Sequence, residues 1–336
     1  MNSAIDIHAH VVPSDFPKWM GKHLPAGWPS MVDAEAKCGC CHKHVMIDNQ
    51  LYRTVSEKCW NPHMRLEDMR NMGLAKQALS PMPELLSYWL DPNHAQALLR
   101  FINESIAEMA SQSQGQFIGL AGVPLQSMDL ALQELDYAIH RLGMKGVELG
   151  SHINGTPLSD PSLRPFFEAC VSLNVPVFVH ALKPTGMDRL VGPKNLQQVL
   201  AYPSDVGLAA AAAITGNLLV DLPELKLAFS HGGGTFASLL PRLQQGWLTF
   251  PALADSMPIA PIEQAQRLFF DSLVFDPNTL RHLVSKFGVS QVMVGTDYPF
   301  NFHEHHPVDA IKQCGFSQTE TEALLWGNAG RFLDLP

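Results

Sequence analysis

Short apolar runs alternate with segments of helical period along most of this chain. Each run is bounded by Gly, Pro or polar residues and is short enough to be a buried β-strand. The predicted strands are residues 4–10, 75–80, 117–123, 146–149, 175–180, 226–230, 268–271 and 292–295. The predicted helices between them are residues 65–72, 93–114, 129–142, 161–173, 205–215, 235–246 and 278–287. A capping box over residues 317–320 predicts one more helix, which runs to residue 326.

This alternation of strand and helix predicts an α/β fold. Eight units favour a closed (β/α)8 TIM barrel that forms a single domain over residues 1–336. An open, doubly wound sheet has the same local pattern, so periodicity alone does not decide closure. Residues 14–62 follow no period and are rich in Pro, Gly, His and Cys. We interpret them as a small N-terminal insertion of loops and short strands, with residues 44–52 as its best strand and Arg53 at the end of that strand.

Composition and charge exclude several classes of partner. Hydrophobic residues make up 46% of the chain and charged residues 16%, as in an ordinary globular protein. The formal net charge is -9, and no cluster of Lys and Arg offers a surface for nucleic acid or an anionic membrane. The longest apolar run, residues 206–214, is too short to span a bilayer. We therefore expect a cytoplasmic protein with reduced cysteines and a small-molecule substrate.

Polar residues follow the predicted strands at their carboxyl ends, which meet at one mouth of a parallel barrel. His8 and His10 end the first strand, His180 the fifth, and His231 and Asp297 follow the sixth and eighth. Each of these residues taken alone could have a purely structural role, as a buried histidine or a turn aspartate. The five together favour a functional site. Three imidazoles and a carboxylate suit zinc or another borderline divalent metal. We interpret His231 as a general acid/base rather than a ligand, because histidine ordinarily titrates near neutral pH.

Two other motifs are weaker. The Gly232-Gly233-Gly234 run lacks the Lys-Ser/Thr ending of a P-loop and the spacing of a dinucleotide fingerprint, so a nucleotide site is disfavoured. A second metal site is conceivable at a cysteine cluster, with His42 and His44 close by, but its spacing matches no common zinc motif. The cluster consists of Cys38, Cys40 and Cys41. The alternative is a reduced, cysteine-rich loop in the insertion.

With these residues in view, the chain resembles the amidohydrolase superfamily and, within it, the aminocarboxymuconate-semialdehyde decarboxylase family. The likeness covers nearly the whole chain. It rests on Ile5-Asp6-Ile7-His8-Ala9-His10, Cys59-Trp60-Asn61-Pro62, Val123-Pro124-Leu125-Gln126, Val179-His180, His231-Gly232-Gly233-Gly234, Phe270-Asp271-Ser272 and Gly295-Thr296-Asp297-Tyr298-Pro299-Phe300.

The resemblance implies a barrel with a small insertion and one divalent metal, zinc first and manganese as the alternative. Its ligands would be His8, His10, His180 and Asp297, and the catalytic residues His231 and Asp297. The strand that ends in Glu148-Leu149 has no lysine at its tip, in agreement with a single metal.

The resemblance also implies two arginines that bind substrate carboxylate. Arg53 and Arg242 match their places, and Arg242 would reach the neighbouring site of a homodimer. The family has further basic residues at two places, which correspond to residues 46–50 and 248–250 of this chain. Neither stretch contains Lys or Arg here, so we expect a less cationic pocket.

The predicted activity is non-oxidative decarboxylation of an unsaturated or aromatic carboxylate such as an aminocarboxymuconate-semialdehyde-like compound. An alternative on the same scaffold is hydrolysis or hydration, in which water opens a lactone, an amide or a ring, or adds to an unsaturated dicarboxylate. These reactions release no CO₂. A binding protein without turnover is a third reading, which the complete set of expected ligands and base disfavours.

Overall fold

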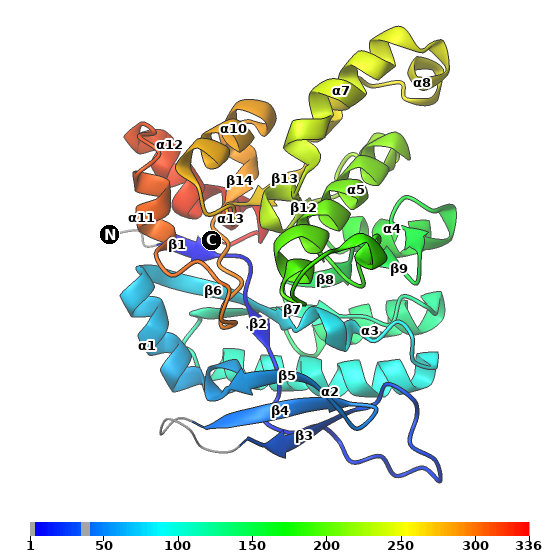
Figure 1. Cartoon of the computed structure of the whole chain (residues 1–336), viewed down its shortest axis with the longest axis vertical. Helices are drawn as coiled ribbons and strands as arrows, with labels where there is room; N and C mark the ends of the chain where they lie inside the picture. Colours follow the sequence, from blue (N-terminus) through cyan, green and yellow to red (C-terminus); the bar gives the residue numbers. More distant parts are fainter. Residues whose placement is uncertain (1–3, 35–40, 336) are drawn as a thin grey trace.

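Eight parallel strands form the wall of a barrel in a computed structural model that describes residues 4–34 and 41–335 (Figure 1). The last strand returns to the first, because Asp6 bridges to Val294 and the Ile7 N–H donates to the Val294 carbonyl at 2.9 Å. The predicted (β/α)8 barrel is therefore confirmed. In order around the barrel, the strands are β1 Ala4–Asp6, β6 Leu74–Pro81, β7 Phe117–Gly122, β8 Gly146–Gly150, β11 Val177–His180, β12 Leu227–Phe229, β13 Phe269–Asp271 and β14 Val292–Met293.

Helices cover the outside of the barrel, one after nearly every strand. The main ones are α1 Pro62–Met72, α2 Pro92–Ser111, α3 Met128–His140, α4 Arg164–Ser172, α5 Tyr202–Thr215, α7 Phe236–Thr249 and α10 Pro277–Phe287. The predicted capping box opens α12 Gln318–Glu322, and the chain continues through a π-helical turn into α13 Asn328–Phe332. Shorter helices that the sequence analysis did not predict are α6 Leu218–Asp221, α8 Pro251–Ser256, α9 Pro261–Ala265 and α11 Pro307–Lys312. No helix in the described ranges combines the length and apolar character needed to cross a membrane.

The hydrophobic core has two layers, one on each side of the barrel wall. The larger layer lies between the strands and the surrounding helices. The smaller layer fills the barrel and is closed by Phe332 and Leu333, which follow the last strand. Its strand residues are Ile5, Ile7, Ala78, Ile118, Leu120, Phe178, Ala228, Phe269 and Met293. These apolar side chains fill the amino-terminal end of the barrel. The polar side chains inside the barrel therefore lie at the opposite, carboxyl end.

The first strand is interrupted at the point where the predicted ligands begin. Residues 4–10 were predicted as one strand, but the structure has β1 and then β2 His10–Val11, both paired with β6. Asp6 pairs with Gln77 and His10 with Ser80, so the first strand has one residue more than β6 over this stretch. Such a bulge reverses which side chains face inward. Ile7 therefore packs in the inner layer but Ala9 in the outer one, which leaves the neighbouring histidines facing the interior.

The segment between β2 and α1 contains a three-stranded antiparallel sheet at the lower edge of Figure 1. Its strands are β3 Pro29–Asp33, β4 His42–Ile47 and β5 Gln50–Ser56. The prediction of one strand over residues 44–52 was wrong, because Asp48 and Asn49 turn the chain with φ angles of 51° and 60°. This left-handed pair is a tight hairpin turn that Asp and Asn tolerate well. Arg53 lies within β5. A small hairpin, β9 His152–Ile153 and β10 Thr156–Pro157, follows β8.

Candidate metal centre and active site

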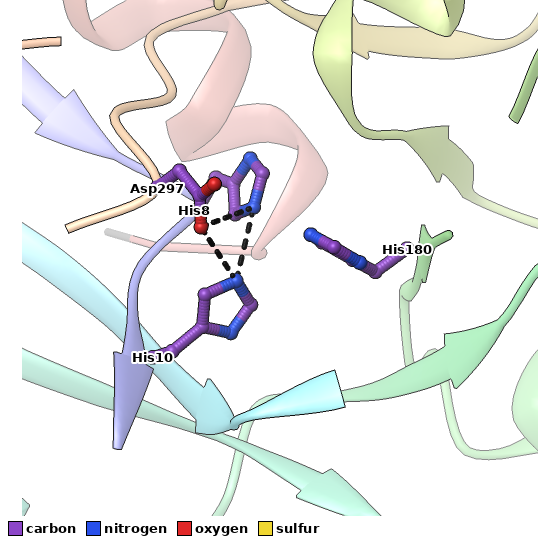
Figure 2. A group of neighbouring side chains, drawn as sticks. All are labelled: His8, His10, His180 and Asp297. Carbon is purple, nitrogen blue, oxygen red and sulfur yellow. Dashed lines mark hydrogen bonds and ion pairs between the residues drawn. The ribbon is translucent and has the colours of Figure 1, made fainter. Parts of the chain in front are cut away.

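The carboxyl ends of the strands bring the five predicted site residues around one space. His8 and His10 come from the bulged first strand, and His180 is the last residue of β11. His231 follows β12, and Asp297 lies in the loop after β14. Figure 2 shows the side chains of His8, His10, His180 and Asp297 directed toward a common centre. The strand-end pattern in the sequence therefore corresponds to real proximity.

The separations between the ligand atoms of the four side chains in Figure 2 suit a site for one metal ion. His10 Nε2 lies 3.1 Å from Asp297 Oδ1, and His8 Nε2 lies 3.6 Å from the same oxygen. One ligand atom from each of His8, His10, His180 and Asp297 can be chosen so that all four lie within 4.8 Å of one another. Ligands about 2.0–2.1 Å from a tetrahedral zinc ion lie about 3.4 Å apart, which is close to this spread.

Hydrogen bonds on the far side of each imidazole determine which nitrogen faces the centre. Each Nδ1 contacts an oxygen, so we assign the proton to Nδ1 and a lone pair to the inward Nε2. The contacts are His8 with Asp271 Oδ2 at 2.6 Å, His10 with the Pro81 carbonyl at 3.0 Å, and His180 with the Ala181 carbonyl at 2.8 Å.

With the protons on Nδ1, the hydrogen-bond acceptors of the four side chains face one another at the centre of the cluster. The Nε2 atoms of His8 and His10 lie 3.1 Å apart, and two lone pairs at that distance repel. His180 Nε2 and Asp297 Oδ1 are buried and have no hydrogen-bond partner among the described residues. A cation among the four atoms would relieve both problems, so the donor set fits one divalent ion.

Burial controls the charge states of the cluster. Burial lowers the pKa of His8, and burial together with the neighbouring histidines holds the pKa of His180 well below its usual value. For Asp297, hydrogen bonds with His10 and His231 and the nearby charges of His8 and His10 outweigh burial and hold its pKa well below the ordinary range. His10 differs, because Glu148 and Asp297 outweigh burial and raise its pKa. Neutral imidazole and ionised carboxylate are the forms that bind metal, and three of the four groups favour them.

Asp271, at the end of β13, ties the cluster to His231. Besides its contact with His8, its Oδ2 accepts a hydrogen bond from the His231 N–H at 3.0 Å, and its Oδ1 accepts one from the Gly232 N–H at 2.7 Å. Asp271 had no predicted role, although it ends a predicted strand as the predicted ligands do. Glu148 was also missed: it is fully buried on β8, 3.8 Å from His10 Nδ1, and burial raises its pKa to about 7.

His231 lies beside the cluster and remains accessible. Its Nε2 is 4.0 Å from Asp297 Oδ2, its Nδ1 is 3.0 Å from Ser230 Oγ, and its side chain is 11% exposed. The glycine run after it has a steric purpose, because a Cβ on Gly234 would lie 1.7 Å from the Pro203 carbonyl oxygen. The run thus lets the chain pass close to α5.

One cavity joins the cluster to Arg53. His180, His231, Asp297 and Arg53 all line it, and its volume of about 280 Å³ suits a small molecule. The Arg53 guanidinium stands 4.4 Å from the centre of the Phe300 ring. Arg242 is exposed on α7 and does not line this cavity in the described chain. Within this chain, therefore, Arg53 lies at the site, whereas Arg242, which was predicted to reach a neighbouring subunit's site, lies away from it.

The cysteine cluster of the insertion is described only in part. Cys38 and Cys40 lie outside the described residues, and Cys41 is an exposed free thiol. Within residues 4–34 and 41–335, the only group of three or more His, Cys, Asp or Glu side chains with metal-binding proximity is the one in Figure 2.

Comparison with known proteins gives consistent matches. A family model described as amidohydrolase matches residues 5–335. The chain is 37% identical to the 2-amino-3-carboxymuconate-6-semialdehyde decarboxylase of Dictyostelium discoideum, over 98% of this chain and 91% of that protein. The apo crystal structure of IDCase from Metarhizium anisopliae superposes with a TM-score of 0.82 at 18% identity, over 99% and 97% of the two chains. A dihydroxybenzoic acid decarboxylase from Polaromonas, with bound manganese and the inhibitor 2-nitroresorcinol, has a TM-score of 0.72 at 21% identity, over 81% and 85%.

Proposed function

This chain belongs to the amidohydrolase family, and we infer that it is a carboxy-lyase that catalyses metal-dependent, non-oxidative decarboxylation of an unsaturated or aromatic carboxylate. The observation that carries this inference is the shared cavity. The Arg53 guanidinium, a group suited to anions, lines the same cavity as His231 and two members of the four-residue group that could hold a metal ion. Two of the relatives given above, the Dictyostelium protein at 37% identity and the Polaromonas protein, are decarboxylases, which supports the same reaction.

We propose that His8, His10, His180 and Asp297 bind one divalent ion. Zinc suits three imidazoles and a carboxylate, and manganese, which the Polaromonas structure contains, is the alternative. When bound, such an ion supplies a Lewis acid that draws electron density from a substrate oxygen. The Nδ1 contacts of the three histidines keep their ligand nitrogens oriented, and Asp271 does so for His8 while also fixing the backbone of His231.

Two further residues act directly on the substrate in this proposal. Arg53 binds carboxylate through forked, charge-assisted hydrogen bonds. His231 moves the proton that takes the place of the carboxyl group on carbon, since its Nε2 faces the cavity near Asp297. The carbon–carbon bond breaks, its electron pair passes into the unsaturated system, and CO₂ leaves. Protonation of the carbon balances the reaction without an oxidant.

The direct test is the identity of the products. The protein, loaded with zinc or with manganese, is incubated with aromatic and muconate-like acids, and both CO₂ and the organic product are quantified. Decarboxylation yields one CO₂ per substrate consumed and a product that lacks the carboxyl group. Consumption of an acid with uptake of water and no CO₂ would instead establish hydrolysis or hydration.

Replacing Arg53 with Met is expected to weaken substrate binding more than turnover. Hydrogen bonds to charged groups contribute about 1.5–3 kcal/mol, so KM should rise about tenfold to a hundredfold. Arg53→Lys, which retains the charge but not the fork, should give an intermediate KM. Steady-state kinetics separate the two parameters. A large fall in kcat with an unchanged KM would contradict a binding role.

We also propose a homodimer in which Arg242 enters the neighbouring site. Arg242 lies on α7, which extends with α8 beyond the barrel in Figure 1. Leu239, Leu248 and Phe250 on and next to this helix are 48%, 65% and 59% exposed, an apolar surface that a second copy would cover.

Mixing two inactive variants tests this arrangement. In a 1:1 mixture of His231→Asn and Arg242→Ala chains that exchange subunits, about a quarter of the sites should be intact, because each mixed dimer has one complete site. Activity should recover to about a quarter of the unmodified level. If Arg242 served its own chain, every site would lack one residue and no activity would return.

We propose a reducing, cytoplasmic location for this protein, and the state of the cysteines supports it. We also propose a small-molecule carboxylate as its partner. The described cysteines, Cys41, Cys59, Cys170 and Cys314, are all free thiols. Disulfides are rare in the cytosol and common outside it. Fractionation of cells that express the full chain tests the location.

A further inference from the structure

Arg65 is a fully buried arginine on α1 that takes no part in the proposed reaction. Arginine is almost never buried to this extent unless its donors are paired. Its Nη1 donates to Gln77 Oε1 at 2.9 Å, and its Nη2 donates to the carbonyl groups of His10 at 2.6 Å and Lys58 at 3.1 Å. The guanidinium therefore binds the backbone of a proposed metal ligand.

Asp6 is a second fully buried charged residue, and Gln77 on β6 joins it to Arg65. Gln77 Oε1 accepts from Arg65, and Gln77 Nε2 donates to Asp6 Oδ2 at 2.8 Å. Asp6 accepts three further hydrogen bonds, from the His8 N–H at 3.0 Å and from the N–H and hydroxyl of Thr296 at 3.1 and 2.6 Å. Each oxygen of Asp6 thus has two donors, and the three side chains form one continuous Asp6–Gln77–Arg65 network.

This network holds the backbone around three of the four proposed ligands. It binds the N–H of His8 and the carbonyl of His10 directly. It reaches Asp297 through the preceding residue, Thr296, and the Asp297 N–H also donates to the His8 carbonyl at 2.9 Å. These contacts lie where the extra residue of the first strand interrupts its regular pairing with β6. Side chains there replace strand partners and fix the geometry of the bulge.

Stability alone does not account for this network. Arg65 is removed from water, and its Nε has no hydrogen-bond partner among the described residues. It meets Asp6 through Gln77 rather than in a direct ion pair. Buried ionic groups arranged in this way contribute little to stability compared with well-packed apolar side chains of the same volume. Hydrogen bonds are directional, however, so the network fixes relative positions that apolar packing leaves adjustable.

We propose that Asp6, Gln77 and Arg65 are positioning residues that set the spacing of three metal ligands. Through that spacing, they determine the affinity of the site for its ion and the geometry in which the ion is held. None of the three lines the cavity. The inference rests on the metal site of the proposed function, but not on the reaction that takes place there.

Asp6→Asn tests the inference, with Glu134→Gln as the matched control. In both variants an amide replaces a fully buried carboxylate and turns an NH₂ group toward donors. Glu134 accepts hydrogen bonds from Arg100 and Asn103, and none of its hydrogen bonds reaches a proposed ligand. Both variants should unfold at a lower temperature than the unmodified protein when metal-free. Only Asp6→Asn should bind zinc more weakly, by about tenfold to a hundredfold in competition with a chelator.

Cobalt in place of zinc reports the geometry of the site without any need for turnover. Co²⁺ binds nitrogen and oxygen ligands as zinc does, and its visible absorption depends on their number and arrangement. The absorption band should change in position and intensity in Asp6→Asn. It should match the unmodified protein in Glu134→Gln. A purely structural role of Asp6 would leave the spectrum of the cobalt-loaded protein unchanged.

Gln77→Met provides an uncharged test that does not depend on the folding of Asp6→Asn. Methionine has a similar size but makes neither hydrogen bond of the Gln77 amide, so it disconnects Asp6 from Arg65. The matched control is Asn103→Leu, which removes a buried amide that bonds to Gly122. Gln77→Met should lower the zinc affinity about tenfold and change the cobalt spectrum. Asn103→Leu should do neither.

The outcomes separate this inference from the proposed function. A lower unfolding temperature in Asp6→Asn and Gln77→Met, with unchanged zinc affinity and cobalt spectrum, would overturn the positioning role and leave the metal site intact. Absence of zinc binding by the unmodified protein would overturn the metal site and the positioning role together. If affinity and spectrum change as expected but no acid loses CO₂, the proposed reaction fails while the positioning role stands.

Discussion

Dialysis against a chelator is expected to abolish CO₂ release, and addition of zinc or manganese to restore it. Polarisation by a divalent ion contributes several kcal/mol to a transition state, so the loss should be about a thousandfold or more. The ion should also stabilise the fold, because it draws together four closely spaced acceptor groups that lack a cation between them otherwise. With free metal a thousand times above its Kd, this contribution is about 4 kcal/mol. Activity assays and thermal unfolding of the same samples measure both effects.

A ligand variant provides the control for that experiment. His180→Ala removes one inward nitrogen, so it should bind less than stoichiometric metal and should show little difference in unfolding temperature with and without the ion. Elemental analysis checks the metal content. Full activity in a chelated sample that contains no metal would show that the four residues do not hold a functional ion.

Replacing His231 with Asn is expected to lower kcat by about 10²- to 10⁴-fold, the usual effect of removing a proton-transfer group. Asn is the appropriate substitution because residue 231 has a φ of 54°, a left-handed conformation that Asn adopts more readily than Ala. The backbone N–H bond to Asp271 should therefore remain, and so should the orientation of His8. Metal content should be unchanged, since His231 Nε2 lies outside the four-residue group.

The matched control is His63→Asn, at an exposed position on α1 that belongs neither to the cavity lining nor to the four-residue group, and it should leave kcat and KM unchanged. Kinetics and elemental analysis on both variants separate chemistry from metal binding. Loss of the ion from His231→Asn would assign residue 231 to the ligand set instead of to proton transfer.

The strand-end pattern predicted which side chains meet, but not how they are oriented. On an unbroken strand His8 and His10 would share a face, because alternate residues of a strand do so. They do meet, yet the reason includes a bulge that reverses the facing of the strand after Ile7. The extra residue is visible only when the first strand is paired with β6, so the sequence of the first strand alone does not reveal the bulge. Two of the contacts that orient the imidazoles, His8 with Asp271 and His10 with the Pro81 carbonyl, likewise join residues far apart in the chain. The third joins His180 to the carbonyl of the next residue, Ala181.

The wall of the cavity was the part least accessible to sequence reasoning. Arg53 was identified only through family resemblance, and its strand was misjudged because the turn at Asp48 and Asn49 divides residues 44–52. Glu84 was not identified at all. In the sequence it stands in a short turn that follows a buried strand, and such acidic residues are usually exposed. Only packing against Tyr202 and Arg53 makes it a buried group.

The amino-acid sequence by itself determined the alternation of strands and helices and the positions of the proposed ligands at strand ends, because hydrophobic periodicity and turn residues act over a few neighbouring residues. The tertiary structure alone decided barrel closure between β1 and β14, the inward direction of His8 and His10, and the pairing of Arg53 with Glu84. Those features depend on distances between residues that are remote in the chain. Such distances follow from register and packing, which no local pattern encodes.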